Sequence, residues 1–458
     1  MKTPSGHEAL LKDESKYCSY GDTVHYNDEI KIFKSCDGSF LYDEQDKAYL
    51  DLQMWYSAVN LGYRNRQVVE AVQKQLDTLP QLASSYIHEG KIVLSKQLAE
   101  RNKAAFGEEG RVHFNVGGSQ AIEDSMKLLR KKTGKTKFLA FQGSYHGRTI
   151  AATEITASYR YRKNYGHFSN RAHFVPYPYC FRCPYDKKLE SCDYYCVKQF
   201  EKQFESEAGS FADMKTNECE YAAFYVEAVQ GTGGYIFPPA DYFKRLKKTL
   251  DRFGIYLVDD EIQMGFYRTG KFWSIEHYGV SPDVVVFGKA LTNGMNPLSG
   301  FWAKENLVNP SQFPAGSTHS TFSSNPMGTA AGVATMNVLN QKELETDLNR
   351  RGEEFLGMLK DLQKKYPVIA DLDGRGMAFR LEICKPDGIT PDPKLTDRIY
   401  QDGLKGDLTY KGKQVGLVLD IGGHYKNVFT LSPSFFMSRD EMVMAYELMD
   451  QLFQRHTF

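Results

Sequence analysis

Short β-rich runs alternate with segments of helical periodicity from about residue 112 to residue 303. Parallel strands must be joined by crossovers and are covered on both faces, so this alternation is typical of a mostly parallel sheet flanked by helices. The expected strands are Arg111 to Val116, Lys137 to Phe141, Tyr221 to Val226, Ile255 to Asp259, Asp283 to Phe287 and Ser299 to Ala303, with helices at Ala121 to Leu129 and Tyr242 to Phe253. The sequence therefore predicts an α/β fold.

The pattern changes after Asn325-Pro326, where long amphipathic stretches at Leu344 to Lys365 and Arg439 to Gln454 surround the run Gly374 to Arg380. These features predict a second, smaller α+β domain over residues 331–458. The hairpin-like stretch Phe33 to Leu52 predicts that residues 1–60 join this small domain. The large domain, residues 61–330, would then be inserted between the two parts of the small one.

The charges of the chain exclude some classes of partner. It has 57 basic and 57 acidic side chains and a formal net charge of zero, whereas nucleic-acid binders and proteins held on anionic lipid normally carry a basic excess. No apolar run approaches the roughly 20 residues of a membrane helix, and the first residues do not resemble a secretory signal. We therefore expect a cytoplasmic protein with small-molecule partners, no nucleic acid and no membrane.

Two expected strands end in residues that carry chemistry. One runs into Asp259-Asp260-Glu261, and a later one ends in Gly288-Lys289. The carboxyl ends of strands in an open α/β sheet face the ligand crevice, so Asp260 and Lys289 can meet there. A lysine with a lowered pKa can form a Schiff base with a carbonyl cofactor, and pyridoxal phosphate needs a carboxylate at its ring nitrogen. These residues therefore indicate pyridoxal phosphate (PLP) as the cofactor.

With these motifs the chain resembles the class III, fold-type I PLP-dependent aminotransferases, the group that includes ornithine and 4-aminobutyrate aminotransferases. The resemblance runs from about Asp51 to the C-terminus, and its carboxylate motif is matched by residues 260–265, Asp-Glu-Ile-Gln-Met-Gly. It implies that Asp260 binds the pyridine nitrogen, that Gln263 binds the ring hydroxyl oxygen and that Ile262 packs on one ring face. Lys289 would be the Schiff-base lysine.

The resemblance also assigns the rest of the cofactor site. A Gly-Gly-Ser turn between strand and helix offers free backbone N–H groups to an anion, which makes Gly118 and Ser119 the phosphate ligands. Tyr145 would stack on the pyridine ring, and Glu227 would steady the cofactor. Ser320 and Thr321 match the segment that reaches the phosphate of a neighbouring subunit's cofactor, which implies a homodimer with shared active sites.

Two departures from the family concern the substrate. Many members pair a Glu with an Arg to admit glutamate, but here Thr232 replaces the Glu and Thr430 stands where the Arg belongs. The usual binding of glutamate or 2-oxoglutarate is therefore not expected. The segment that contains Trp55 and Tyr56 resembles the ornithine-aminotransferase-like entrance. Arg148, with Tyr56, could hold a substrate carboxylate, or Arg148 could be a structural ion-pair residue.

Four cysteines cluster in an insertion at about residues 176–200. Cys180, Cys183, Cys192 and Cys196 have a C-x2-C-x8-C-x3-C arrangement that can close around structural zinc. Four free thiols in a surface excursion are the competing interpretation, and it is the one that we favour.

The expected activity is transamination between an amine or amino acid donor and a keto acid, ketone or aldehyde acceptor. Asp260 would keep the ring protonated, and Lys289 would move the proton as general acid and base. An amino-acid racemase or epimerase on the same fold is the alternative, because the absence of the Glu/Arg pair leaves it open. A catalytically dead scaffold is disfavoured because the cofactor residues are all present.

Overall fold

The computed structural model describes residues 6–22, 30–166, 168, 172–207 and 211–457. Its largest sheet has seven strands in the order β4-β10-β9-β8-β7-β5-β6. The strands are β4 (Gly110–Asn115), β5 (Lys137–Phe141), β6 (Ala172–Val175), β7 (Tyr221–Val226), β8 (Tyr256–Asp260), β9 (Val284–Phe287) and β10 (Ser299–Lys304). The pairs β8–β9, β7–β8, β5–β7 and β5–β6 are parallel, whereas β10 runs antiparallel to both of its neighbours.

All six predicted strands are present within one residue at each end, and the α/β fold is confirmed. β6 was not predicted. The strands β7 and β9 are buried along their whole length, as expected of strands covered on both faces.

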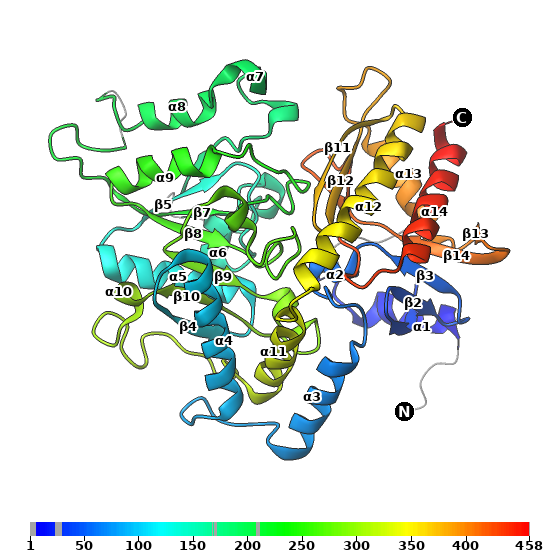
Figure 1. The fold of residues 1–458 in the computed structure, drawn as a ribbon, viewed down its shortest axis with the longest axis horizontal. Coiled ribbons are helices and arrows are strands. Elements are labelled where there is room, and N and C mark those ends of the chain that lie inside the picture. Colours follow the sequence, from blue (N-terminus) through cyan, green and yellow to red (C-terminus); the bar gives the residue numbers. More distant parts are fainter. Residues whose placement is uncertain (1–5, 23–29, 167, 169–171, 208–210, 458) are drawn as a thin grey trace.

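Helices cover both faces of this sheet (Figure 1). On one face α5 (Gly118–Thr133) packs Ile122 and Met126 against alternate strand residues such as Val258. On the other face α4 (Glu89–Phe106) and α9 (Tyr242–Arg252) contribute Leu98 and Phe243 to a separate core. The N-terminus of α5 therefore lies on the face to which Val258 and, two residues later, Asp260 point.

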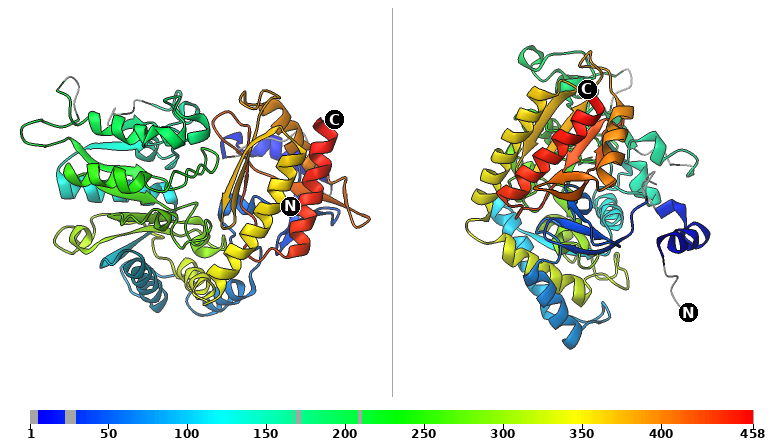
Figure 2. Two further views of the ribbon diagram at one scale, coloured as in Figure 1. Left: turned by 45° about the horizontal axis from the view of Figure 1, so that its top comes forward. Right: turned by 90° about the vertical axis from the view of Figure 1, so that its right-hand side faces the viewer.

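The N-terminal and C-terminal segments form one further body, which lies beside the seven-stranded sheet in Figure 1 and in the left view of Figure 2. Its first sheet has the order β1-β2-β3-β14-β13, with β3 parallel to β14 through Leu50 and Leu417. Its second sheet has the order β11-β12-β16-β15. Because strands from both ends of the chain share a sheet, we propose that residues 1–60 and 331–458 make up the small domain and residues 61–330 the large one.

The elements of this body have the following bounds: β1 (Phe33–Asp37), β2 (Phe40–Asp43), β3 (Ala48–Asp51), β11 (Ile369–Arg375), β12 (Ala378–Ile383), β13 (Leu408–Tyr410), β14 (Lys413–Val418), β15 (Ile421–Gly422), β16 (Val428–Leu431), α1 (His7–Tyr17), α2 (Met54–Ser57), α12 (Leu344–Lys365), α13 (Pro393–Leu404) and α14 (Arg439–Thr457). The other α-helices are α3 (Arg66–Thr78), α6 (Ile150–Glu154), α7 (Leu189–Cys192), α8 (Tyr195–Lys202), α10 (Glu305–Val308) and α11 (Pro326–Leu339). None of the helices among the described residues is both long and apolar enough to cross a membrane.

Candidate active site

A cavity of about 210 Å³ lies at the carboxyl ends of β8 and β9, and we call it the inner cavity. Asp260 is the last residue of β8, and Lys289 follows β9 after Gly288. The inner cavity brings together eight of the predicted cofactor residues: Gly118, Ser119, Tyr145, Glu227, Asp260, Ile262, Gln263 and Lys289. His146, Gly147, Val229 and Met264 complete its lining.

Asp260 is held at the floor of the inner cavity by two hydrogen bonds. The Asp260 Oδ1 atom accepts from the Ile262 backbone N–H at 3.1 Å, and Oδ2 lies 2.8 Å from Nδ1 of the buried His146. The adjacent Asp259 points to the other side of the strand with Glu261, because strand side chains alternate. Burial and the neighbouring Glu261 carboxyl raise the pKa of Asp259 well above its usual range. Of the two aspartates, Asp260 alone lines the inner cavity.

The first turn of α5 forms one wall of the inner cavity. Its N-cap, Gly117, supplies no side-chain cap, so the orphan N–H groups of the first turn are open to an anion. Gly147 has a φ of +124°, and a Cβ on it would lie 2.2 Å from Ser119 Oγ. Ser119 Oγ also accepts from the Arg148 backbone N–H at 3.2 Å. Residue 147 lies so close to Ser119 that only glycine fits there. Gly118, Ser119 and Gly147 thus form a wall of small residues that fits a phosphate group.

Glu227 connects two loops at the inner cavity. Its carboxylate accepts from the backbone N–H groups of Tyr145 and Gly231, both at 2.9 Å. Burial raises the pKa of Glu227 to about 7, and the charge of Asp260 adds to this effect while His146 opposes it.

Lys289 presents its amine to the inner cavity without a partner. The structure gives the Nζ atom no hydrogen bond or ion pair with any described residue. Burial lowers the pKa of Lys289 to about 8, against the opposing effect of Asp260, Glu227 and Asp420. An amine that is neutral in a substantial fraction of molecules near neutral pH is a competent nucleophile for a carbonyl. This amine, the Asp260 carboxylate and the α5 N-terminus fit the aldehyde, ring nitrogen and phosphate of PLP.

A second cavity of about 220 Å³, the outer cavity, shares Tyr145, Gln263 and Lys289 with the inner one. It contains Tyr56, Arg148 and Thr232, three of the predicted substrate residues. Thr232 and Thr430 both line it, so the structure brings together the two positions where the family places its Glu/Arg pair. The sequence did not single out four more lining residues: Tyr161, Tyr235, Asp420 and Lys426. Asp420 and Lys426 follow β14 and β15 in loops, where no periodic pattern could have identified them.

Tyr56 reaches the outer cavity from an unusual turn. Four successive residues, Met54 to Ser57, have φ values of 45°, 51°, 56° and 65°, which is left-handed backbone. For residues other than glycine this conformation costs roughly 1–2 kcal/mol each. The turn buries Met54 and Ser57, while Trp55 is 56% exposed and lies outside both cavities. Burial raises the pKa of Tyr56 to about 12, and the charge of Asp420 contributes.

Arg148 makes no ion pair with the residues that the structure describes. Its Nε donates to the Tyr145 hydroxyl at 3.3 Å, and its guanidinium lies 4.5 Å from the centroid of the Tyr161 ring. A cation that is oriented by aromatic groups and has no carboxylate partner is available to a ligand. The geometry therefore favours the substrate-carboxylate role of Arg148 over the structural ion pair.

Ser320 and Thr321 do not line either cavity. Thr321 lines a separate cavity of about 670 Å³ with Pro80 to Ala83, and Phe322 beside it is 69% exposed. The two residues thus take no part in the site of their own chain.

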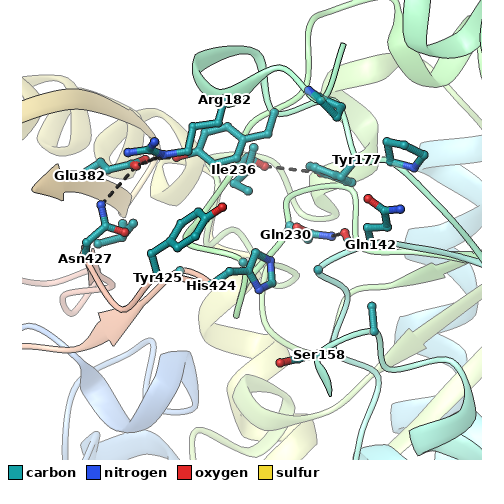
Figure 3. A pocket seen from close by; sticks show the side chains of 18 residues that line it. Gln142, Ser158, Tyr177, Arg182, Gln230, Ile236, Glu382, His424, Tyr425 and Asn427 are labelled. Atoms are coloured by element: carbon teal, nitrogen blue, oxygen red, sulfur yellow. Dashed lines mark hydrogen bonds and ion pairs between the residues drawn. The ribbon is translucent and has the colours of Figure 1, made fainter. Parts of the chain in front are cut away.

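A lateral cavity of about 410 Å³ lies behind the loop that carries Thr232. Figure 3 shows Arg182, Glu382 and Asn427 joined on one side of it, with Gln142 and Gln230 on the other. It is lined in part by Tyr177, Tyr179 and Pro184 of the cysteine-containing insertion.

The four clustered cysteines are free thiols in the structure. Burial raises the pKa of Cys180 and of Cys196 to about 11, and the other thiols of the cluster add to the shift. Nevertheless, within the described ranges no three His, Cys, Asp or Glu side chains come close enough to hold a metal ion. The zinc considered for Cys180, Cys183, Cys192 and Cys196 is therefore not supported, because zinc needs four ligands at bonding distance.

Comparison with known proteins places this site in a family. The Leucine/methionine racemase of Thermococcus litoralis is 30% identical over 404 residues, which are 88% of this chain and 86% of the racemase. The Acetylornithine aminotransferase of Caldanaerobacter subterraneus subsp. tengcongensis is 27% identical over 98% of this chain and 100% of its own length. A solved amine transaminase from an uncultivated Pseudomonas species, in its PLP-bound form, superposes with a TM-score of 0.83 at 25% identity and covers 100% of this chain and 98% of its own.

The sequence also matches the family described as Aminotransferase class-III over residues 24–453. That match spans nearly the whole chain and confirms the resemblance inferred from the carboxylate, Gly-Lys and Gly-Gly-Ser motifs. The protein with this inner cavity belongs to the class III aminotransferase family.

Proposed function

We propose that this protein is a PLP-dependent transaminase that uses Lys289 to exchange an amino group between an amine or amino acid donor and a keto acid, ketone or aldehyde acceptor. The observation that carries the proposal is the unpartnered Lys289 amine, with a pKa of about 8, across the inner cavity from Asp260. Membership of the aminotransferase family supports the reaction class.

The roles of the residues follow from their positions. Lys289 would attach the cofactor, Asp260 would bind its ring nitrogen, Gln263 its ring oxygen, and Gly118 and Ser119 its phosphate. Ile262 and Tyr145 would cover the ring, and Glu227 orients the loops at residues 145 and 231. When bound, PLP supplies an electron-withdrawing ring that stabilises negative charge on the substrate carbon. The Lys289 amine would act as the general base that takes the proton from that carbon and as the general acid that returns it.

We also propose that the protein is a homodimer. Large apolar side chains are exposed on one stretch of chain and on the loop beside it: Leu76, Leu79, Tyr86, Ile87, Ile92 and Phe322. An exposed apolar surface of this kind is typical of a protein–protein interface. Ser320 and Thr321 lie in this region and outside their own active site, which supports their predicted contact with a partner's cofactor. A cytoplasmic location remains our prediction.

Racemisation is the second candidate function, because the Thermococcus litoralis relative is named a racemase and Thr232 and Thr430 replace the pair that admits glutamate. A racemase returns the proton to the same carbon and releases no carbonyl product.

The test is a stopped-flow half-reaction screen of the holoenzyme, read from the cofactor's visible spectrum. Donors should include glutamate, ornithine, lysine, alanine and a simple aliphatic amine. We expect at least one donor to give a carbonyl product together with the pyridoxamine form of the cofactor, and glutamate to be a poor donor. Release of the D-enantiomer from an L-amino acid with no keto acid would refute transamination in favour of racemisation.

A further inference from the structure

A carboxylate with a fixed orientation faces the reacting lysine across the outer cavity. Asp420 lines this cavity together with Lys289 and Tyr56. Its Oδ1 atom accepts from Gln53 Nε2 at 3.2 Å, and its Oδ2 atom accepts from Thr430 Oγ1 at 2.7 Å. Each carboxylate oxygen can accept a further hydrogen bond, so Asp420 is oriented but not saturated.

Asp420 has no cationic partner among the residues that the structure describes, since no Lys, Arg or His nitrogen there lies within 4.0 Å of it. Both groups that donate to Asp420 are neutral, the Gln53 amide and the Thr430 hydroxyl. A carboxylate in a cavity that closes over a substrate is costly unless a cation pairs with it. Lys289, Arg148 and Lys426 line the same cavity, but none of their nitrogen atoms lies within 4.0 Å of Asp420, so a cationic group of the substrate can take that place.

Positive groups line the same outer cavity. The Lys426 Nζ atom makes one hydrogen bond, to the Ile421 carbonyl at 3.4 Å, and neither Lys426 nor Arg148 forms an ion pair with a described residue. Burial lowers the pKa of Lys426 to about 8, with Arg160 and Arg148 adding to the shift and Asp420 opposing it. The cavity therefore presents a carboxylate and two cations that are free to bind a ligand.

We propose that Asp420 binds a second, protonated amino group of the substrate and that Lys426 with Arg148 binds its carboxylate. The preferred donors are then diamino monocarboxylic acids, which place one amine at Lys289 and keep the other for Asp420. This inference rests on the proposed transaminase function and names its substrate class. It also gives a reason for Thr430, because an arginine at that position would meet the Asp420 carboxylate and neutralise it.

The test compares three donors that differ by one charged group each. Ornithine has both amines and the carboxylate, norvaline lacks the second amine, and putrescine lacks the carboxylate. Asp420→Asn keeps the shape and can still accept from Thr430 but removes the charge. The change should raise the half-saturating concentration of ornithine about 10- to 100-fold and leave that of norvaline within about threefold, since a charge-assisted hydrogen bond is lost for ornithine alone.

Lys426→Gln should raise the half-saturating concentrations of ornithine and norvaline alike and leave that of putrescine unchanged. Asp440→Asn is the matched control for Asp420→Asn. Asp440 is an exposed aspartate in the first turn of α14, where it pairs with Lys411, and it does not line the outer cavity. A second readout that needs no turnover is the equilibrium binding of the three donors to the borohydride-reduced enzyme, measured by calorimetry. The same order of effects is expected there.

The inference would be overturned if Asp420→Asn raised the half-saturating concentrations of ornithine and norvaline equally, or did not raise that of ornithine. If wild-type enzyme converts glutamate or monoamines readily and does not prefer ornithine, this inference fails while transamination stands. If no donor reacts although Lys289 carries the cofactor, the proposed function fails instead. Product analysis then identifies which of the two amines of ornithine is transferred.

Discussion

Replacing Asp260 by asparagine is the sharpest test of the inner cavity. The change keeps the size of the side chain and its hydrogen bond from the Ile262 N–H, but it removes the negative charge that lies 2.8 Å from His146. At an effective dielectric constant of ~20, the Asp260 carboxylate would stabilise a protonated ring nitrogen of PLP at hydrogen-bond distance by about 5 kcal/mol. A neutral hydrogen bond between the asparagine side chain and the ring nitrogen would retain about 1 kcal/mol of this stabilisation.

The remaining difference of about 4 kcal/mol corresponds to a roughly thousandfold slower half-reaction. The assay is a stopped-flow half-reaction with the best donor from the screen. The phosphate contacts at α5 are untouched, so the variant should still retain its cofactor after dialysis, as judged by absorbance.

Asp259→Asn is the matched control for this experiment. Burial and Glu261 raise the pKa of Asp259 well above its usual range, and its carboxyl does not line the inner cavity, so it does not serve the ring nitrogen. The control should therefore react within about threefold of the wild-type rate. A near-normal rate for Asp260→Asn, or an equal loss in Asp259→Asn, would refute the assignment of Asp260 to the ring nitrogen.

Four further predictions concern lysine chemistry and stability. Lys289→Ala should lose the yellow cofactor on dialysis and give no borohydride-reducible adduct, and an adduct that persists in peptide mapping would mean that another lysine is the attachment site. Because the pKa of Lys289 is lowered to about 8 and only the neutral amine reacts, covalent capture of PLP by the apoprotein should speed up about tenfold from pH 6 to pH 7 and level off above pH 8; a flat profile would contradict this. The pKa of Lys426 is also about 8, so its charge is lost as the pH rises through 8. The half-saturating concentration of norvaline relative to that of putrescine should therefore rise above pH 8. In Lys426→Arg this rise should occur at a higher pH, and a rise at the same pH would contradict the role of Lys426. Arg268→Met should lower the free energy of unfolding by about 3–5 kcal/mol in urea titrations, since the buried guanidinium donates to the carbonyls of Met377 and Pro433 at 2.8 and 2.7 Å; a change below 1 kcal/mol would refute the importance of these bonds.

Local sequence patterns predicted most of the large sheet and the placement of Asp260 and Lys289, whereas the resemblance to the family supplied the other residues predicted to bind the cofactor. Runs such as Tyr221 to Val226 are apolar throughout and match β7, because a strand covered on both faces has no polar side. Asp260 and Lys289 could be placed in one site because each directly follows a predicted strand, and parallel neighbouring strands end at the same edge of a sheet. Their positions at the ends of neighbouring strands were thus enough to predict that Asp260 and Lys289 line one site.

Only the tertiary structure revealed two charged residues on the substrate side of the site. Asp420 and Lys426 come from loops of the small domain, and they meet Lys289 only because β3 pairs with β14 and brings both ends of the chain beside the large sheet. The His146 contact with Asp260 and the antiparallel direction of β10 also depend on contacts between segments far apart in sequence. The cysteine spacing allowed a zinc site that the described residues of the insertion do not form, because spacing limits how far apart ligands can be but does not bring them together. Strands and strand ends follow from side-chain periodicity within a few residues, whereas a pocket between loops follows from the packing of the whole chain.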